Sequence, residues 1–283
     1  MVNNRDEKDK VTTASLKFEQ LKKRLQDLGS AVIAYSGGVD STFLVKTAYD
    51  VLGNNVIAVT ATSSTYPKAE FKEAERLAHL IGVRHLIIES EETDIDNFKR
   101  NPLDRCFYCK NELFSKLKEI AAKENLAHVL DGTNYEDFDD YRPGLRALRE
   151  LDIISPLAEV KLTKKEIRYL SKNIKLDTWD KQSFACLASR FPYGTRITKR
   201  KLKVVEEAEN VLRNLGMTVY RVRYHNEIAR IEVDKKDFQL VLNNAHKINK
   251  KFRSLGFKYI TLDLKGYRTG SLNEGLVPRK NEG

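Results

Sequence analysis

The sequence is poor in cysteine and has no long apolar run, and each absence excludes a class of protein. Three cysteines, Cys106, Cys109 and Cys186, are too few for a disulfide framework, and an odd number favours metal or redox chemistry. No segment approaches the roughly 18 consecutive apolar residues that a membrane-spanning helix needs. The opening residues MVNNRDEKDKVTTASLKFEQ include acidic residues and no apolar core, so no secretory signal is expected. We therefore expect a cytoplasmic protein without a membrane partner.

Positive charge is distributed unevenly along the 283 residues. The chain has a formal net charge of +10, and residues 190–283 contain 21 Lys or Arg against 10 Asp or Glu. The rest of the chain is therefore nearly neutral. A basic C-terminal part beside a near-neutral N-terminal part favours an anionic partner, such as a nucleotide, a metabolite with several carboxylates, or RNA.

Short apolar runs alternate with helical patterns in the N-terminal part. Strands are expected at residues 31–35, 56–61 and 84–90, and a strand followed by a turn is expected at residues 128–134. This alternation predicts an α/β fold with a doubly wound parallel sheet. From Thr198 the order changes to helix, strand, strand, helix, strand, which is typical of a small α+β domain.

The change of pattern predicts two domains. We expect a first domain at residues 1–190 and a basic α+β domain at residues 191–283. Residues 237–256 are expected to form one helix of the second domain. Thr163 is expected to cap a helix over residues 162–173.

A phosphate-binding loop, SGGVDS, follows the first expected strand. The loop precedes a helix, whose first N–H groups and dipole favour anions, and its glycines let the backbone approach phosphate oxygens. Asp40 is placed to hold Mg²⁺. No GxxxxGK[ST] motif occurs, so the loop is not of the γ-phosphate-transferring type. It is expected to bind the β,γ-pyrophosphate of ATP. Such binding leaves the α-phosphorus open to attack, which predicts AMP transfer and pyrophosphate release. The candidate ATP-binding residues are Ser36, Gly37, Gly38, Val39, Asp40 and Ser41.

The loop resembles that of the PP-loop ATP pyrophosphatase superfamily, which includes GMP synthetase, NAD synthetase, argininosuccinate synthetase and tRNA-thiolating enzymes. The resemblance implies a sheet of the adenine nucleotide alpha hydrolase-like type that uses ATP and Mg²⁺. It also implies that Ala61, Thr62 and Ser63, at the end of the second strand, border the adenosine. Taken alone, these three residues are equally consistent with a plain strand end.

Three acidic residues, Asp131, Asp139 and Asp140, cluster around a turn after the fourth expected strand. This turn is expected near the C-terminal edge of the sheet. The carboxylates could bind Mg²⁺ or cap turns, and the sequence favours neither.

The cysteines suggest a metal or sulfur site. Cys106 and Cys109 form a C-x-x-C motif at the start of a helix beside Arg105 and Lys110, and both the helix end and the cations lower a thiol pKa. With Cys186 they could hold a [4Fe–4S] cluster and leave one iron without a protein ligand, where a sulfide could bind. The residues alone leave four alternatives open: a zinc site with one histidine, a redox pair, structural cysteines, or one sacrificial cysteine.

The second domain offers a basic substrate face. Arg221 and Arg223 alternate along a strand and so share one face, where two guanidinium groups suit a phosphate or a pair of carboxylates. Glu232, in the adjoining strand, could orient these arginines or hold a metal. Arg190 follows Cys186 closely enough to stand near the reacting sulfur. The alternative is a solvated strand face with salt bridges.

Longer segments resemble the LarE family, the nickel-pincer nucleotide sulfur transferases. The similarity runs from about residue 15 to 273 and is carried by DRCFYCKNELF, VLDGTNYEDFDDYRPGLRA, KQSFACLASRFPYGTRIT, VYRVRYHNEIARIE and YITLDLKGYRTGSLN. It implies adenylylation of a carboxylate of pyridinium-3,5-biscarboxylic acid mononucleotide, displacement of AMP by sulfur, and repetition on the second carboxylate. Catalytic roles then fall to Cys106, Cys109, Cys186 and Arg190, and substrate binding to Arg190, Arg221, Arg223 and Glu232.

The resemblance divides the family by sulfur source. Some members sacrifice a single cysteine, which aligns with Ala185 here, whereas the three-cysteine pattern implies a [4Fe–4S] cluster. We expect an anionic pyridinium nucleotide substrate, a sulfide or sulfur donor and a homo-oligomer, and no nucleic-acid partner.

There are two alternative functions. A tRNA-thiolating enzyme would need paired CxxC motifs and a basic surface rich in aromatic residues. A non-enzymatic nucleotide-binding iron–sulfur carrier would not turn over ATP.

Overall fold

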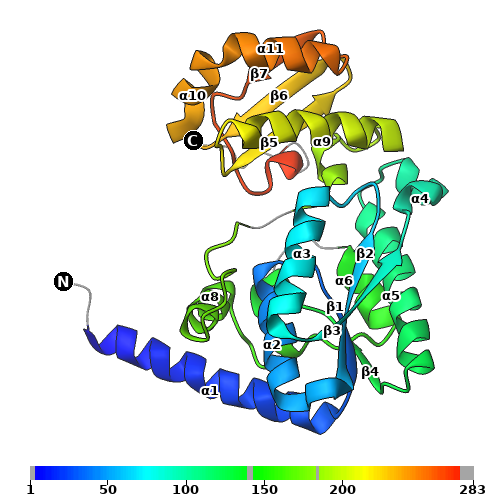
Figure 1. The fold of residues 1–283 in the computed structure, drawn as a ribbon, viewed down its shortest axis with the longest axis vertical. Coiled ribbons are helices and arrows are strands. Elements are labelled where there is room, and N and C mark those ends of the chain that lie inside the picture. The colour runs from blue at the N-terminus through cyan, green and yellow to red at the C-terminus, as the bar shows by residue number, and fades with distance from the viewer. Residues whose placement is uncertain (1–3, 139–142, 183–184, 275–283) are drawn as a thin grey trace, which may run out of the picture. The chain divides into compact units, whose positions relative to one another are not determined.

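The chain divides into two compact units. The computed structural model describes residues 4–138, 143–182 and 185–274 (Figure 1). The first unit comprises Met1–Glu92 and Leu103–Phe184, and the second comprises Thr93–Pro102 and Ala185–Gly283. The sequence placed a boundary between residues 190 and 191 and did not assign residues 93–102 to the second unit.

The first unit is built on a four-stranded parallel sheet. Its strands are β1 (Ala31–Ala34), β2 (Val56–Thr62), β3 (Arg84–Glu89) and β4 (His128–Leu130), in the order β3-β2-β1-β4. All three pairings are parallel, as the alternation of strands and helices predicted. The chain reverses direction across the sheet between β1 and β4. In such sheets the crevice outside the carboxyl ends of the strands at this point is the usual ligand site.

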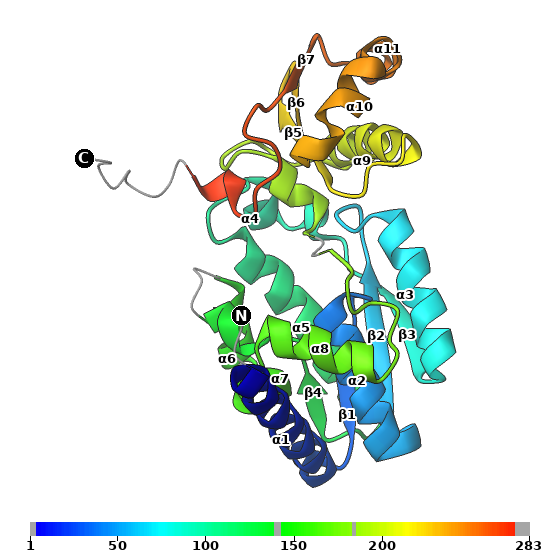
Figure 2. The same cartoon turned by 90° about the vertical axis from the view of Figure 1, so that its left-hand side faces the viewer.

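Helices cover both faces of this sheet, because successive apolar residues of the strands point to opposite sides. Ala31 and Ile33 pack with the helices that precede and follow β1, whereas Val32 packs with the helix that carries the C-x-x-C motif. Figure 2 shows α1 and α8 on the side that faces the viewer. The α-helices of this unit are α1 (Asn4–Leu28), α2 (Val39–Leu52), α3 (Lys68–Ile81), α5 (Arg105–Lys123), α6 (Gly144–Glu150), α7 (Pro156–Glu159) and α8 (Lys164–Asn173). None of the helices in the described ranges is long and apolar enough to cross a lipid bilayer.

Residues 93–102 belong to the second unit because their backbone pairs there. This segment includes α4 (Asp96–Lys99). The side-chain amide of Asn101 donates to the carbonyls of Phe191 and Pro192, at 3.3 and 2.8 Å. The backbone carbonyl of Asn101 accepts from Gly194 N at 2.9 Å. These partners lie about 90 residues away in sequence, so local sequence patterns carried no signal for the assignment.

The second unit has the predicted order of helix, strand, strand, helical segment and strand. A three-stranded sheet is formed by β5 (Tyr220–His225), β6 (Ile228–Val233) and β7 (Tyr259–Leu262); β5 and β6 are antiparallel, and β6 and β7 are parallel. The single helix predicted at residues 237–256 is wrong, because the chain bends at Asn244, whose side-chain amide donates to the Leu240 carbonyl at 2.9 Å. Besides α4, the α-helices of this unit are α9 (Lys199–Asn214), α10 (Phe238–Asn243) and α11 (Ala245–Ser254).

The two faces of the small sheet differ in polarity. Val222, Ala229 and Ile231 contribute to an apolar core with the helices. The alternate positions place Arg221 and Arg223 on the opposite face, where the register sets them across from Glu232 and Arg230. The predicted shared face of the two arginines is therefore confirmed.

Candidate functional site: a phosphate loop and a buried arginine cluster

The phosphate loop connects β1 to α2 in the first unit. The hydroxyls of Ser36 and Ser41 lie 3.1 Å apart across it, and Ser36 N donates to the Ser41 hydroxyl at 3.3 Å. Gly37 has a φ of +62°, and a Cβ there would lie 2.8 Å from the Cβ of Ala74. Only glycine fits this position, because a side chain would be both strained and in collision.

Asp40 lies at the start of α2 and forms an ion pair with Lys164, the first residue of α8. Burial raises the pKa of the Asp40 carboxyl above its usual value, and the charge of Lys164 offsets part of this rise. The second carboxylate oxygen, Oδ1, is buried and accepts no hydrogen bond from the described residues. A buried carboxylate oxygen with unused capacity beside a phosphate loop fits a Mg²⁺ ligand.

Two further side chains contact the backbone of the loop. Lys181 Nζ donates to the Gly37 carbonyl at 3.0 Å and pairs with Glu70 of α3 at 2.8 Å. The Tyr66 hydroxyl donates to the Ser36 carbonyl at 2.8 Å, and burial raises the pKa of that phenol. The loop is thus held from outside by groups that bind its carbonyls.

The predicted adenosine border leads to one of the cysteines through a chain of hydrogen bonds. Beyond the end of β2, the hydroxyls of Ser63 and Thr65 lie 2.9 Å apart, and Thr65 donates to Glu92 at 3.2 Å. The thiol of Cys109 donates to the other oxygen of Glu92 at 3.5 Å. Burial raises the pKa of this carboxyl. Ala61 and Thr62 lie within the last residues of β2, as predicted.

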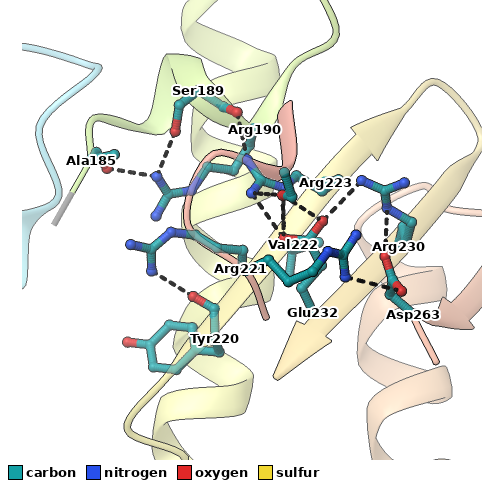
Figure 3. Close-up of polar contacts among 12 residues, drawn as sticks. Ala185, Ser189, Arg190, Tyr220, Arg221, Val222, Arg223, Arg230, Glu232 and Asp263 are labelled. Atoms are coloured by element: carbon teal, nitrogen blue, oxygen red, sulfur yellow. Dashed lines mark hydrogen bonds and ion pairs between the residues drawn. The ribbon is translucent and has the colours of Figure 1, made fainter. Parts of the chain in front are cut away.

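Arg190 is completely buried in the second unit, in the short helical segment Leu187–Arg190 that follows Cys186. It forms a two-pronged ion pair with Glu209 of α9, at 2.9 and 3.0 Å. Its Nη1 donates to the Ala185 carbonyl at 2.6 Å (Figure 3). The same nitrogen donates to the Cys186 carbonyl at 3.0 Å. Arg190 therefore fixes the backbone on which Cys186 stands.

Arg223 is likewise held by a buried carboxylate. Its Nε and Nη2 donate to one oxygen of Glu232 at 3.0 and 2.8 Å, and Nη1 donates to the Ser189 carbonyl at 2.7 Å. Ser271 accepts from Arg223 and donates to Glu232. Glu232 is fully buried and also binds Arg230 at 2.9 Å. Of its two predicted roles, orienting the arginines is the one that the geometry supports.

Arg221 is bound differently from its neighbours. It donates to the carbonyl of Tyr220 at 2.6 Å, and its guanidinium lies 5.2 Å from the centre of the Tyr267 ring. Burial and the positive charge of Arg190 lower the pKa of this guanidinium, which lies beside that of Arg190 in Figure 3. A buried cation next to another cation is stabilised by an anion.

Comparison with known proteins finds relatives along nearly the whole chain. The model of the NAD synthase family matches residues 14–126. Uncharacterised proteins of Synechocystis sp. and Methanocaldococcus jannaschii are 42% and 34% identical, over 92% and 84% of this chain and 98% and 90% of theirs. A pyridinium-3,5-bisthiocarboxylic acid mononucleotide synthase of Lactiplantibacillus plantarum is 41% identical over 94% of this chain and 97% of its own. The chain belongs to the LarE family.

Membership of the LarE family confirms several predictions made from sequence. The chain is an ATP-dependent sulfurtransferase with a PP-loop α/β fold, and this fold implies the use of ATP and Mg²⁺. The similarity covers both the unit with the phosphate loop and the unit with the arginine cluster.

The cysteines of this LarE-family chain lie in different units. Cys106 is in the first turn of α5 and is exposed, and Cys109 begins the second turn, whereas Cys186 is in the second unit. None of the three is in a disulfide bond. In the described ranges, no group of three or more His, Cys, Asp or Glu side chains is placed to hold a metal ion. The donor set fits an iron–sulfur cluster in kind, since two thiols stand one helical turn apart at a helix start.

Of the three residues in the predicted acidic cluster, Asp131 lies in the described part of the chain. Asp131 accepts hydrogen bonds from Thr133 N at 3.2 Å and from the Ser155 hydroxyl at 2.6 Å, so it organises the turn after β4. Asp139 and Asp140 lie outside the described residues.

Sequence reasoning missed several residues of the candidate site, among them two lysines of the first unit. Lys164 contacts Asp40 across 124 positions and Lys181 contacts Gly37 across 144, so no local motif links them. The one available signal was the predicted cap at Thr163, which places Lys164 at the start of a helix. In the second unit the missed residues are Glu209 and Ser271.

Proposed function

We propose that this protein adenylylates the carboxylates of pyridinium-3,5-biscarboxylic acid mononucleotide and converts them to thiocarboxylates. The observation that carries the proposal is the similarity to a synthase of the bisthiocarboxylic acid product, which extends through both units. A PP-loop without a Walker lysine supports it, because such a loop suits pyrophosphate release rather than γ-phosphate transfer.

In the first half-reaction a substrate carboxylate oxygen attacks the α-phosphorus of ATP, and pyrophosphate leaves. The loop residues Ser36 to Ser41 bind the β,γ-pyrophosphate through backbone N–H groups and two hydroxyls. Asp40 holds Mg²⁺ through its buried oxygen. Lys164, which forms an ion pair with Asp40, would bind a phosphate oxygen once Asp40 holds the ion.

In the second half-reaction a sulfur nucleophile attacks the carbonyl carbon of the acyl adenylate, and AMP leaves. Arg221 binds the anionic substrate, since burial and the charge of Arg190 make an added anion favourable there. Arg190 positions the Cys186 backbone, and Glu232 keeps Arg223 and Arg230 in place. Arg190 and Glu232 therefore act through their neighbours rather than on the substrate.

The three cysteines are the proposed sulfur site. Cys106, Cys109 and Cys186 would hold a [4Fe–4S] cluster, which would supply a sulfide at the iron without a protein ligand. Glu92 accepts the hydrogen bond of the Cys109 thiol and so orients that side chain. A sulfide or another small sulfur donor is the proposed co-substrate.

Incubation of anaerobically purified protein with ATP and the pyridinium substrate tests this function. We expect AMP and pyrophosphate in equal amounts and a product in which sulfur replaces carboxylate oxygen, detected by mass spectrometry. Iron and sulfide analysis of wild-type protein and of each Cys→Ser variant tests the sulfur site. ADP as the main product would refute the proposed reaction. Loss of one H₂S from the chain after turnover, at Cys186 alone, would instead establish a sacrificial cysteine.

A further inference from the structure

Residues 179–181 form a short strap beside the phosphate loop, held on one side by α8. Arg168 of α8 donates to the carbonyls of Trp179 and Lys181, at 2.8 and 2.7 Å. These two bonds fix the backbone from which the Lys181 side chain extends. Lys172, also of α8, lies 4.5 Å from the centre of the Trp179 ring. The strap is thus part of the first unit, and its backbone is anchored by Arg168 of α8.

Lys181 spans the distance from the strap to the loop. Its ammonium donates to the Gly37 carbonyl at 3.0 Å and is paired with Glu70 at 2.8 Å. The Lys181 side chain is 19% exposed and that of Glu70 is 23% exposed, so both are partly shielded from water. A charged donor shielded in this way holds a carbonyl more firmly than a neutral one.

The contact determines which way one peptide of the loop faces. The Gly37 carbonyl and the Gly38 N–H belong to the same peptide group, and no described peptide bond is cis. In a trans peptide the C=O and N–H point in opposite directions. A carbonyl held toward Lys181 therefore turns the Gly38 N–H away from Lys181. The positive φ of Gly37 and its close approach to Ala74 restrain the Cα from which this peptide starts.

We propose that Lys181 is a positioning residue for pyrophosphate binding, which acts by holding the Gly37–Gly38 peptide so that the Gly38 N–H faces the phosphates. The ligand class is the β,γ-pyrophosphate of ATP. Glu70 holds the Lys181 ammonium against the Gly37 carbonyl. Arg168 holds the backbone of residues 179–181 beside the loop. The inference rests on the proposed function only in taking pyrophosphate as the group that the loop binds.

Titration of wild-type and Lys181→Met protein with Mg·ATP and with AMP, without the second substrate, tests the proposal. Methionine keeps the length and apolar stem of the side chain but removes the donor. We expect Mg·ATP to bind about tenfold more weakly or worse, as for loss of one hydrogen bond to a charged group. AMP has no pyrophosphate and should bind as in wild type. Lys181→Arg should recover part of the ATP affinity.

A matched control and a second variant make the test decisive. Lys172→Met removes a lysine that contacts the same strap but not the loop, and should leave both affinities unchanged. Arg168→Met leaves Lys181 intact but frees the strap, and should weaken Mg·ATP selectively, which keeps the proposal testable should Lys181→Met fail to fold.

Equal weakening of ATP and AMP, or wild-type ATP affinity in Lys181→Met or in Arg168→Met, would overturn the role of Lys181. A different result would refute the proposed function. Wild-type protein that binds ATP but makes no thiocarboxylate would refute the reaction and leave this inference standing.

Discussion

The phosphate loop and the arginine cluster both hold charged side chains in pairs, but they differ in how deeply the pairs are buried. At the loop, the side chains of Lys164 and Asp40 are 27% and 19% exposed. In the cluster, the side chain of Arg190 and that of Glu232 are fully buried. Partly exposed pairs contribute little to stability and exchange partners readily, whereas breaking a buried pair leaves an uncompensated charge.

This difference separates residues that bind ligands from residues that maintain the fold. The ion pair of Asp40 can open when Mg·ATP arrives, because each member can be solvated or can bind the ligand. Arg190 and Arg223 have no such freedom, since their guanidinium groups already serve buried carboxylates and backbone carbonyls. Arg221 lies in the cluster but is bound by a carbonyl and an aromatic ring. Because burial and the charge of Arg190 lower the pKa of its guanidinium, we expect the cluster to respond to an anion through Arg221.

The largest expected effect is on the loop side. Asp40→Asn should lower the rate of pyrophosphate release by about a thousandfold or more, because it removes a charged Mg²⁺ ligand that supports transition-state charge. The fold should be retained, since asparagine is nearly isosteric. A coupled pyrophosphate assay and a thermal melt provide the two measurements. An active Asp40→Asn enzyme would contradict the assignment of Asp40 to magnesium.

On the arginine side the largest effect should be on stability. Arg223→Ala should cost about 3–5 kcal/mol in the free energy of unfolding, because Glu232 would remain buried without its main partner. Arg230→Ala provides the control, since Arg230 binds the same carboxylate but is 35% exposed and should cost less. Denaturant unfolding measures both. Equal effects would show that burial does not distinguish these pairs.

A smaller effect is expected for Arg221, and on binding rather than on stability. Arg221→Ala should raise the KM for the pyridinium substrate roughly 10- to 150-fold, the size of about 1.5–3 kcal/mol for a hydrogen bond to a charged group. ATP affinity, measured by titration without the second substrate, should stay close to wild type. Arg221→Lys should restore the KM only in part, because an ammonium keeps the charge but lacks the paired donors of a guanidinium. A large drop in ATP affinity would mean that Arg221 serves the nucleotide.

The smallest effect concerns the pH dependence of stability. The folded-state pKa of Asp40 is raised above its usual value of 3.8, so the folded protein holds this proton more tightly than the unfolded chain. Wild type should therefore lose stability relative to Asp40→Asn as pH rises from about 3.8 to the raised pKa. Unfolding of both proteins across this range measures the difference. A difference that does not change with pH would show that burial does not perturb Asp40.

Local patterns were sufficient for most of the elements and for the loop, because both depend on neighbouring residues; the single helix predicted at residues 237–256 is the exception. The strand periodicity, the SGGVDS motif and the Thr163 cap are short-range features, and the cap is present as a capping box with Glu166. The alternation of Arg221 and Arg223 likewise follows from strand geometry.

Long-range partners could not be predicted in the same way. The guanidinium of Arg223 was expected to bind the substrate. Its donors instead bind Glu232 and Ser271, and Ser271 lies 48 residues away in sequence. The ion pair of Arg190 depends on where α9 packs. A sequence shows that an arginine is present, whereas the packing of the chain decides whether its donors remain available to a ligand.

Residues 93–102 leave the first unit and join the second, which affects the order in which the units can fold during synthesis. The chain passes between the units at 92/93, at 102/103 and again at 184/185. As the chain leaves the ribosome, Asn101 emerges about 90 residues before its partners at Phe191 and Pro192. The second unit therefore cannot close until synthesis has passed the segment that carries Cys186. A fragment that ends at residue 184 would keep residues 93–102 and lose the residues that bind them, so no single cut separates the two units cleanly.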